Sequence, residues 1–186
     1  MKEKEIYLKE SVSNILNMQF NQEIEEIIKT SRKIALNLGE NYISSYHFLL
    51  AMVSSKNLPH TIFDQKELDF QYLTDHLQKG KLETIPENMY MTKEMERALK
   101  ISAYYAWIYR QSEIKAEHIL FAMLADKRSF AGSLLIQNRM TYSGFENEYE
   151  KIQKTKKRKL FKVIGNNSFL INIGFVKLIN QTINTI

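Results

Sequence analysis

The sequence predicts an all-α protein built from two tandem four-helix repeats. The 186 residues include only 6 Gly and 2 Pro, so little interrupts a helix. Apolar residues recur at intervals of three and four over much of the chain, as on a helix with one buried face. The chain also matches itself after a shift of 71 residues, the distance from His47 to His118. A match at one fixed offset indicates a tandem duplication.

The composition is that of an ordinary soluble globular protein, with 44% hydrophobic and 25% charged residues. The length allows one full-sized domain or two small ones with a shared core. The chain has no cysteine, which excludes disulfides, thiolate metal sites and thiol catalysis. Residues 1–20 contain no apolar run long enough for a signal peptide. We therefore expect a cytoplasmic protein.

No motif predicts an enzyme. The glycines are never closer than nine residues apart, as at Gly165 and Gly174, so the chain lacks a Walker A loop, a dinucleotide fingerprint and a G-x-S-x-G elbow. His47 and His118 lie in apolar runs and have no His, Asp or Glu four residues later. We expect both to be buried with a local hydrogen bond rather than to bind a metal. No catalytic residue, metal or cofactor is predicted.

Charge is unevenly distributed along the chain, although the formal net charge is only +5. Eight of the 26 Lys and Arg residues follow Glu150, the last of the 21 acidic residues. Residues 1–150 thus carry 18 basic and 21 acidic side chains, a formal charge of −3. A slightly acidic body has no built-in surface for phosphates, so nucleic-acid binding by the body is not expected.

The first repeat, residues 18–80, opens with an amphipathic helix that Asn21 is expected to cap and Gly39 to end in a left-handed turn. A second helix, residues 45–54, is apolar on nearly all sides and must be buried. Weaker helical patterns cover residues 59–65 and 69–79. The apolar stripe of the opening helix consists of Ile24, Ile27, Ile28, Ser31, Ile34, Ala35 and Leu38.

The second repeat, residues 89–153, follows a linker at 81–88 and has the same order. Thr92 is expected to cap its opening helix, whose stripe is Met95, Ala98, Leu99, Ser102 and Ala106. Arg110 stands where the first repeat has its glycine, so we expect this helix to end differently or to run on. Further helices are predicted at residues 116–125, 130–138 and 143–154.

Two segments flank the repeats: an N-terminal extension, residues 1–17, and a tail, residues 154–186, that is first basic and then apolar. The apolar part, around residues 169–176, is too short and too interrupted for a membrane span, so a membrane partner is not expected. A hairpin turning at residues 165–167 and an end that needs a partner are both compatible with this stretch.

Two pairs of short strings identify a family. Phe20-Asn21 and Met91-Thr92 open the two amphipathic helices, and residues 43–51 and 114–122 share the pattern of an Ile followed by a His and a run of apolar residues. Over residues 18–153 the chain resembles the double repeat at the N-terminus of Clp-type AAA+ unfoldases, without the ATPase modules. This resemblance implies eight helices in a pseudo-twofold arrangement. It also implies a domain that binds protein substrates or adaptors, hydrolyses nothing itself, and works with a Clp-type AAA+ ATPase.

Some N domains of this family recognise phosphorylated arginine with a Thr at the first helix start and the Glu of a Glu-His pair. The resemblance carries these roles to Thr92 and Glu117 in the second repeat. The first repeat has Asn21 and Tyr46 instead, and a tyrosine supplies no negative charge. A helix N-terminus suits a phosphate and a carboxylate suits a guanidinium. The alternative is that Thr92 only caps its helix and Glu117 only favours the helix dipole.

The stretch 104–109 contains more aromatic surface than one helix stripe needs. Tyr104, Tyr105 and Trp107 are therefore candidates for a protein-contact surface, with packing between the repeats as the alternative.

The function predicted from the sequence is a non-enzymatic module that binds protein substrates or adaptors of a Clp-type unfoldase and protease system, with phosphoarginine-marked proteins as a specific possibility. The alternative is a regulatory scaffold that uses the repeats for protein contacts and the basic tail for nucleic acid or a membrane surface. Removal of residues 154–186 separates the two, because only the scaffold depends on the tail.

Overall fold

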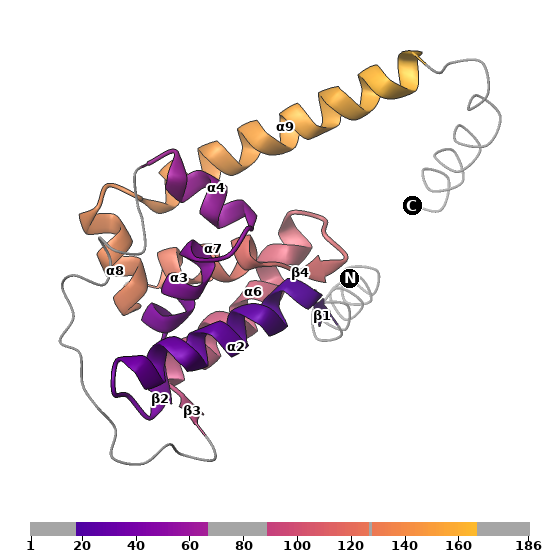
Figure 1. Cartoon of the computed structure of the whole chain (residues 1–186). Helices are drawn as coiled ribbons and strands as arrows, with labels where there is room; N and C mark the ends of the chain where they lie inside the picture. The colour runs from indigo at the N-terminus through magenta and orange to yellow at the C-terminus, as the bar shows by residue number, and fades with distance from the viewer. Residues whose placement is uncertain (1–17, 67–88, 127, 167–186) are drawn as a thin grey trace, which may run out of the picture. The chain divides into compact units, whose positions relative to one another are not determined.

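The computed structural model describes residues 18–66, 89–126 and 128–166, and it confirms the predicted all-α class (Figure 1). The first repeat contributes α2 (Gln22–Asn37), α3 (Ser45–Val53) and α4 (Leu58–Asp64). The second contributes α6 (Lys93–Ile108), α7 (Ala116–Ala125), α8 (Phe130–Gln137) and α9 (Tyr142–Asn166). The predicted extension at 1–17, helix at 69–79 and linker at 81–88 lie outside the described residues, as does the tail from residue 167.

The two repeats interlock through their apolar helices. α2 packs on α3 and α6 packs on α7, so each repeat contains one helix hairpin. Across the repeats, α3 contacts α7 and α8, while α4 contacts α7. Every residue of α3 is buried, as is every residue of α7 from Ala116 to Leu124, which confirms the central position predicted for both helices. Burial of these two largely apolar helices is the main source of the fold's stability.

A two-residue strand precedes each of the helices α2, α3, α6 and α7. In this order the strands are β1 (Gln19–Phe20), β2 (Tyr42–Ile43), β3 (Tyr90–Met91) and β4 (Glu113–Ile114). β1 pairs in parallel with β4, and β2 pairs in parallel with β3. Each pair therefore joins one repeat to the other. These strands were not predicted, because two residues are too few to show an alternating pattern.

The opening helices of both repeats end in the same turn, which corrects the expectation for Arg110. Gly39 has a φ of 79°, as predicted, and Arg110 adopts a φ of 53° at the equivalent position. The next N–H reaches back into the helix in both cases: Glu40 to the Ala35 carbonyl at 2.9 Å and Gln111 to the Ala106 carbonyl at 2.9 Å. The helix therefore ends in a left-handed turn even without a glycine.

The helix that begins at Tyr142 continues past residue 154, where the sequence analysis ended it, to Asn166. No Gly or Pro occurs between Phe145 and Ile164 to stop it. The residues from Glu146 onward form a separate compact unit. Within that unit, Lys151 and Lys154 pair with Glu148 and Glu150 at 3.0 and 2.9 Å. In the described part of the chain, none of the helices combines the length and apolar character that crossing a bilayer requires.

Candidate functional site

The strand pairs create two places where helix starts from different repeats meet. At the first junction, β1 and β4 bring the start of α2 beside the start of α7, and the Asn21 N–H donates to the Ile114 carbonyl at 3.0 Å. At the second junction, β2 and β3 bring the start of α3 beside the start of α6, and the Thr92 N–H donates to the Ile43 carbonyl at 2.9 Å. Each junction thus presents two helix N-termini, which carry partial positive charge.

This arrangement separates Thr92 from Glu117. Arg97, near the start of α6, pairs with Asp126 at the end of α7 at 2.6 Å, so the two helices run antiparallel. Glu117 lies nine residues before Asp126, about 14 Å away along α7. Thr92 therefore belongs to the second junction with Tyr46, and Glu117 belongs to the first junction with Asn21. Spacing along one repeat could not show this, because each junction is made by both repeats.

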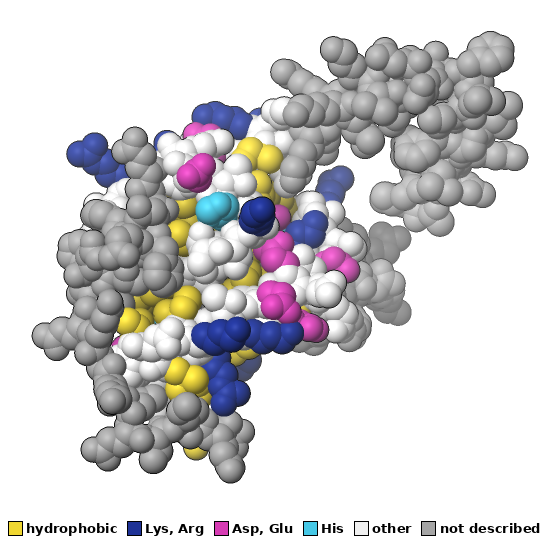
Figure 2. Space-filling model, in the orientation of Figure 1, with side chains coloured by type: hydrophobic (Ala, Val, Ile, Leu, Met, Phe, Trp, Pro, Cys, Tyr) yellow, Lys and Arg dark blue, Asp and Glu magenta, His cyan; other side chains and the backbone are white. Residues whose placement is uncertain are grey.

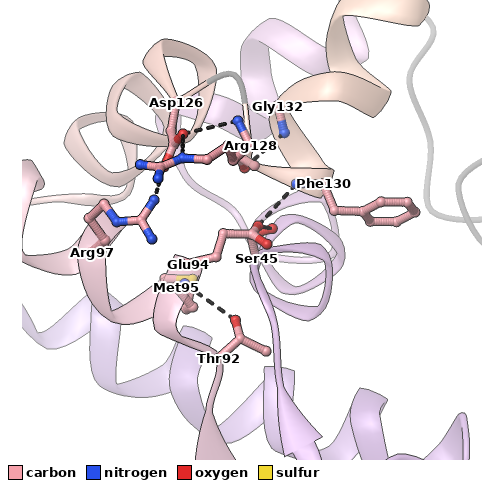
Figure 3. A network of polar contacts seen from close by, with 10 residues as sticks. Ser45, Thr92, Glu94, Met95, Arg97, Asp126, Arg128, Phe130 and Gly132 are labelled. Atoms are coloured by element: carbon pink, nitrogen blue, oxygen red, sulfur yellow. Dashed lines mark hydrogen bonds and ion pairs between the residues drawn. The ribbon is translucent and has the colours of Figure 1, made fainter.

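A filled hydrogen-bond network closes the second junction (Figure 3). The Ser45 hydroxyl donates to Oε1 of Glu94, and the Phe130 N–H donates to the same oxygen at 3.0 Å. The Ser45 hydroxyl also accepts the Ala131 N–H at 3.2 Å. Glu94 thus joins α6 to the starts of α3 and α8. Glu94 was not among the predicted site residues, although an acidic residue in the first turn of a helix is a signal for such a contact.

Thr92 and Tyr46 have structural roles in this closed network. The Thr92 hydroxyl accepts the Met95 N–H at 3.3 Å and so caps α6, as predicted. Tyr46 is buried, and its ring meets Phe130 edge-to-face with centroids 5.7 Å apart. Burial and the nearby Glu40 carboxylate raise the pKa of Tyr46. Tyr46 therefore stays neutral, in agreement with the expectation that it supplies no negative charge.

The first junction has the same plan but lacks the groups that fill the second. Glu23 occupies the position of Glu94, while Ala116 occupies that of Ser45 and has no hydroxyl. α4, the counterpart of α8, carries Pro59 in its first turn, and proline has no N–H to donate. Oε1 of Glu23 is buried without a hydrogen-bond partner in the described structure. The difference between the junctions thus leaves one carboxylate oxygen unsatisfied.

Asn21 adds a second unsatisfied acceptor to the first junction. Its side chain does not cap α2, contrary to expectation, and Oδ1 of Asn21 is buried with no hydrogen-bond partner among the described residues. Burial raises the pKa of Glu23, against the opposing effects of a hydrogen bond from Asn21, the charge of Lys115 and the Ala116 N–H. Glu117, also buried, brings another carboxylate to this junction. Such acceptors suit a ligand that donates hydrogen bonds.

The two histidines confirm the predicted structural role. Nδ1 of His47 accepts the Ser44 N–H at 3.0 Å, and Nδ1 of His118 accepts the Lys115 N–H at 2.9 Å. Burial lowers the pKa of His118 to about 4, so this ring is neutral at physiological pH. Within the ranges that the structure describes, there is no group of three His, Cys, Asp or Glu residues that could hold a metal ion.

The three aromatic candidates divide between interior and surface. Tyr105 stacks on Phe121 of α7, with centroids 5.5 Å apart, and so packs within its own repeat. Tyr104 is 48% exposed and stacks on Trp107 at 6.1 Å. Tyr104 and Trp107 thus remain available for a contact surface, whereas Tyr105 is half-buried against α7.

Charges of both signs are mixed on one face of the described body. Figure 2 shows Lys and Arg beside Asp and Glu on the face that it presents. Lys29, for example, pairs with Glu26 at 2.7 Å on exposed α2. On this face there is thus no continuous positive stripe of the kind that tracks a nucleic-acid backbone.

The pattern of the Clp repeat (R) N-terminal domain family matches residues 19–138, from β1 to the last turn of α8. The chain belongs to this family. The matched span of this Clp N domain includes both junctions and covers nearly two thirds of the sequence. Comparison with curated proteins gives no significant match.

Solved structures show the same fold as this Clp N domain. The Hsp104 N-terminal domain from Candida albicans superposes with a TM-score of 0.60 at 16% identity, over 73% of this chain and 91% of that one. The N-terminal domain of ClpD from Arabidopsis thaliana gives 0.54 at 16%, over 73% and 97%. The N-terminal domain of the ClpV1 ATPase from E. coli gives 0.54 at 13%, over 76% and 88%. At these identities the likeness concerns the fold alone.

Proposed function

We propose that this Clp N domain binds protein substrates or adaptors for a Clp-type AAA+ ATPase, without chemistry of its own, and that the first junction is the binding site. The observation that carries the proposal is the pair of buried acceptors, Oδ1 of Asn21 and Oε1 of Glu23, that lack partners there. An unsatisfied buried acceptor costs about 1–3 kcal/mol. A ligand that donates hydrogen bonds to both recovers this free energy on binding.

The chemistry of the junction favours an arginine side chain, phosphorylated or not. A guanidinium carries several N–H donors in a planar fork, which suits the carboxylates of Glu23 and Glu117 together with the Asn21 oxygen. The starts of α2 and α7 and the ammonium of Lys115 provide positive potential for an attached phosphate. The proposed site thus contains Glu117 and Asn21 from the residues that the family motif indicates. Thr92 is not part of it, and Glu23 is added.

The second junction is a poor alternative. Its carboxylate, Glu94, already accepts from Ser45 and Phe130. A ligand would have to break the contacts that tie α6 to α3 and α8, at a cost that the first junction does not impose.

Titration calorimetry with three versions of one peptide tests the site: the peptide carries phosphoarginine, arginine or citrulline at its centre. We expect binding of the first two and at least a tenfold weaker affinity for citrulline, which lacks the charge. Glu23→Gln should weaken binding tenfold or more, whereas Glu25→Gln, on the exposed side of the same helical turn, should not change it. Equal affinity of all three peptides, or of the two variants, would contradict the proposed site.

The partner is tested separately. The full chain, immobilised, should retain a purified Clp-type ATPase or stimulate its degradation of a phosphoarginine-marked client. Loss of both effects with Glu23→Gln, but not with Glu25→Gln, would tie the partner function to the first junction. If peptides bind but the ATPase is neither retained nor stimulated, the first junction remains the proposed peptide site and the proposed ATPase partner is refuted.

A further inference from the structure

A groove of about 370 Å³ lies between α6 and the paired strands β1 and β4. Its apolar walls come from three elements: Leu99 and Ala103 of α6, Phe20 of β1 with the preceding Met18, and Ile114 of β4. Beyond the groove, the stacked rings of Tyr104 and Trp107 lie next to Ala103, because residues 103, 104 and 107 are neighbours on one side of a helix. We call these residues together, Met18, Phe20, Leu99, Ala103, Tyr104 and Trp107, the α6 apolar surface.

The internal repeat shows which part of this surface the fold does not require. α2 occupies in the first repeat the place of α6 in the second, and its residues equivalent to Ala103, Tyr104 and Ile108 are Arg32, Lys33 and Asn37. All three α2 residues are exposed to solvent. On α6, Tyr104 and Ile108 are 48% and 43% exposed. The other residues of the surface have apolar equivalents in the first repeat, for example Ile28 for Leu99 and Leu36 for Trp107. The contrast is therefore confined to the part of α6 around Tyr104 and Ile108, and the exposed apolar side chains there indicate an occupant.

We propose that residues 1–17 of the same chain are that occupant and cover the α6 apolar surface. The chain enters the described structure at Met18, which is itself part of the groove wall. Seventeen residues reach about 25 Å even at the 1.5 Å rise of a helix, and Leu99 to Ile108 spans only about 14 Å of α6. Direct attachment gives the segment an effective concentration on the order of millimolar, which favours it over a free partner of equal affinity.

The composition of residues 1–17 is complementary to the surface. Apolar residues recur at intervals of three and four near its end, and these are Leu8, Val12, Ile15 and Leu16. Its charges balance, with three Lys and three Glu. The groove rim carries one charge of each sign, Glu96 and Lys100. Apolar burial can therefore drive docking without net repulsion. This inference does not depend on the proposed function, because it involves neither Glu23 nor Glu117.

The chain offers a clean test, since Trp107 is the single tryptophan and there is no cysteine. Val12→Cys, labelled with a nitroxide, should quench most of the Trp107 fluorescence in the full chain, because nitroxides quench at short range. Tyr104→Lys should abolish the quenching by placing a charge on the surface. Lys33→Glu, the matched change at the equivalent position of α2, should leave it intact.

Two further measurements separate the possible occupants. Ile15→Asp combined with Leu16→Asp should shift the Trp107 emission to longer wavelength in the unlabelled chain, whereas Lys9→Ser should not. Quenching should be independent of protein concentration. Quenching that increases with concentration, together with a dimer in sedimentation, would identify a second copy as the occupant and overturn the proposal. Absence of quenching at every concentration would overturn it as well.

Discussion

Ser45→Ala tests the difference between the two junctions most directly. Ser45 is completely buried and its hydroxyl makes two hydrogen bonds: it donates to Glu94 and accepts from the Ala131 N–H at 3.2 Å. The variant removes a bond to a charged group, worth about 1.5–3 kcal/mol, and leaves a buried N–H unsatisfied, at about 1–3 kcal/mol. Glu94 keeps the Phe130 N–H, so part of the network survives.

The two contributions add to an expected loss in the free energy of unfolding of about 2.5–6 kcal/mol, or roughly 5–24 °C in Tm for a chain of this size. Urea denaturation followed by circular dichroism at 222 nm measures it. A loss below about 0.5 kcal/mol, in the range of ordinary surface substitutions, would refute the description of the second junction as a closed network.

Ala116→Ser is the matched control, because it introduces the same hydroxyl at the equivalent position of the first junction. By analogy with the bond from Ser45 to Glu94, the new donor should reach the unsatisfied Oε1 of Glu23, so we expect stability to stay equal or to rise by up to about 1 kcal/mol. Affinity for an arginine peptide should fall, since the hydroxyl occupies an acceptor that the ligand needs. Destabilisation equal to that of Ser45→Ala would show that the two positions are not equivalent.

Three more changes give distinct expected outcomes. Glu23→Gln should raise Tm at neutral pH while it weakens peptide binding. Burial raises the folded-state pKa of Glu23, so the stability associated with its neutral form is present at low pH and is lost as the pH rises through the folded-state pKa. The Tm values of variant and wild type should therefore converge below about pH 4, at the lower end of the usual pKa range of glutamate. Arg110→Gly should stabilise by about 0.5–1 kcal/mol in urea titrations, because glycine adopts the φ of 53° without strain; a loss would imply that the arginine side chain compensates. Gly132→Ala should destabilise by about 1–3 kcal/mol despite the better helix propensity of alanine, since a Cβ there would lie 2.3 Å from the Met123 carbonyl oxygen; an unchanged Tm would show that α8 shifts freely on α7.

Features that depend on neighbouring residues could be predicted from the sequence. The spacing of apolar residues predicted most of the helix ends to within one or two residues. The two apolar runs around His47 and His118 identified the most buried helices. The caps at Thr92 and the glycine turn at Gly39 are also local, because a side chain or a φ angle meets its own helix within a few residues. Because the repeat occurs twice, each of these predictions could be made in both copies, so a single sequence was enough to predict the fold class.

The strands and the junctions could not be predicted in the same way. Whether Asn21 faces Glu117 or Tyr46 depends on how two hairpins pack, and that packing is set by the burial of α3 and α7 against each other rather than by spacing within one repeat. The family motif pointed to Thr92 and Glu117 as a pair, yet the antiparallel course of α6 and α7 places them at opposite ends.

The amino-acid sequence by itself determined the helices, their order and the duplicated plan, because helix periodicity and capping act over three to four residues. Only the tertiary structure decided which helix starts meet and which acceptors remain unsatisfied. Glu23 and Glu94 are the same residue type at equivalent positions. Oε1 of Glu94 accepts hydrogen bonds from Ser45 and Phe130, whereas Oε1 of Glu23 has no partner among the described residues. The physical reason is that hydrogen-bond satisfaction depends on donors brought from distant segments, here α3 and α8 on one side and Ala116 and Pro59 on the other.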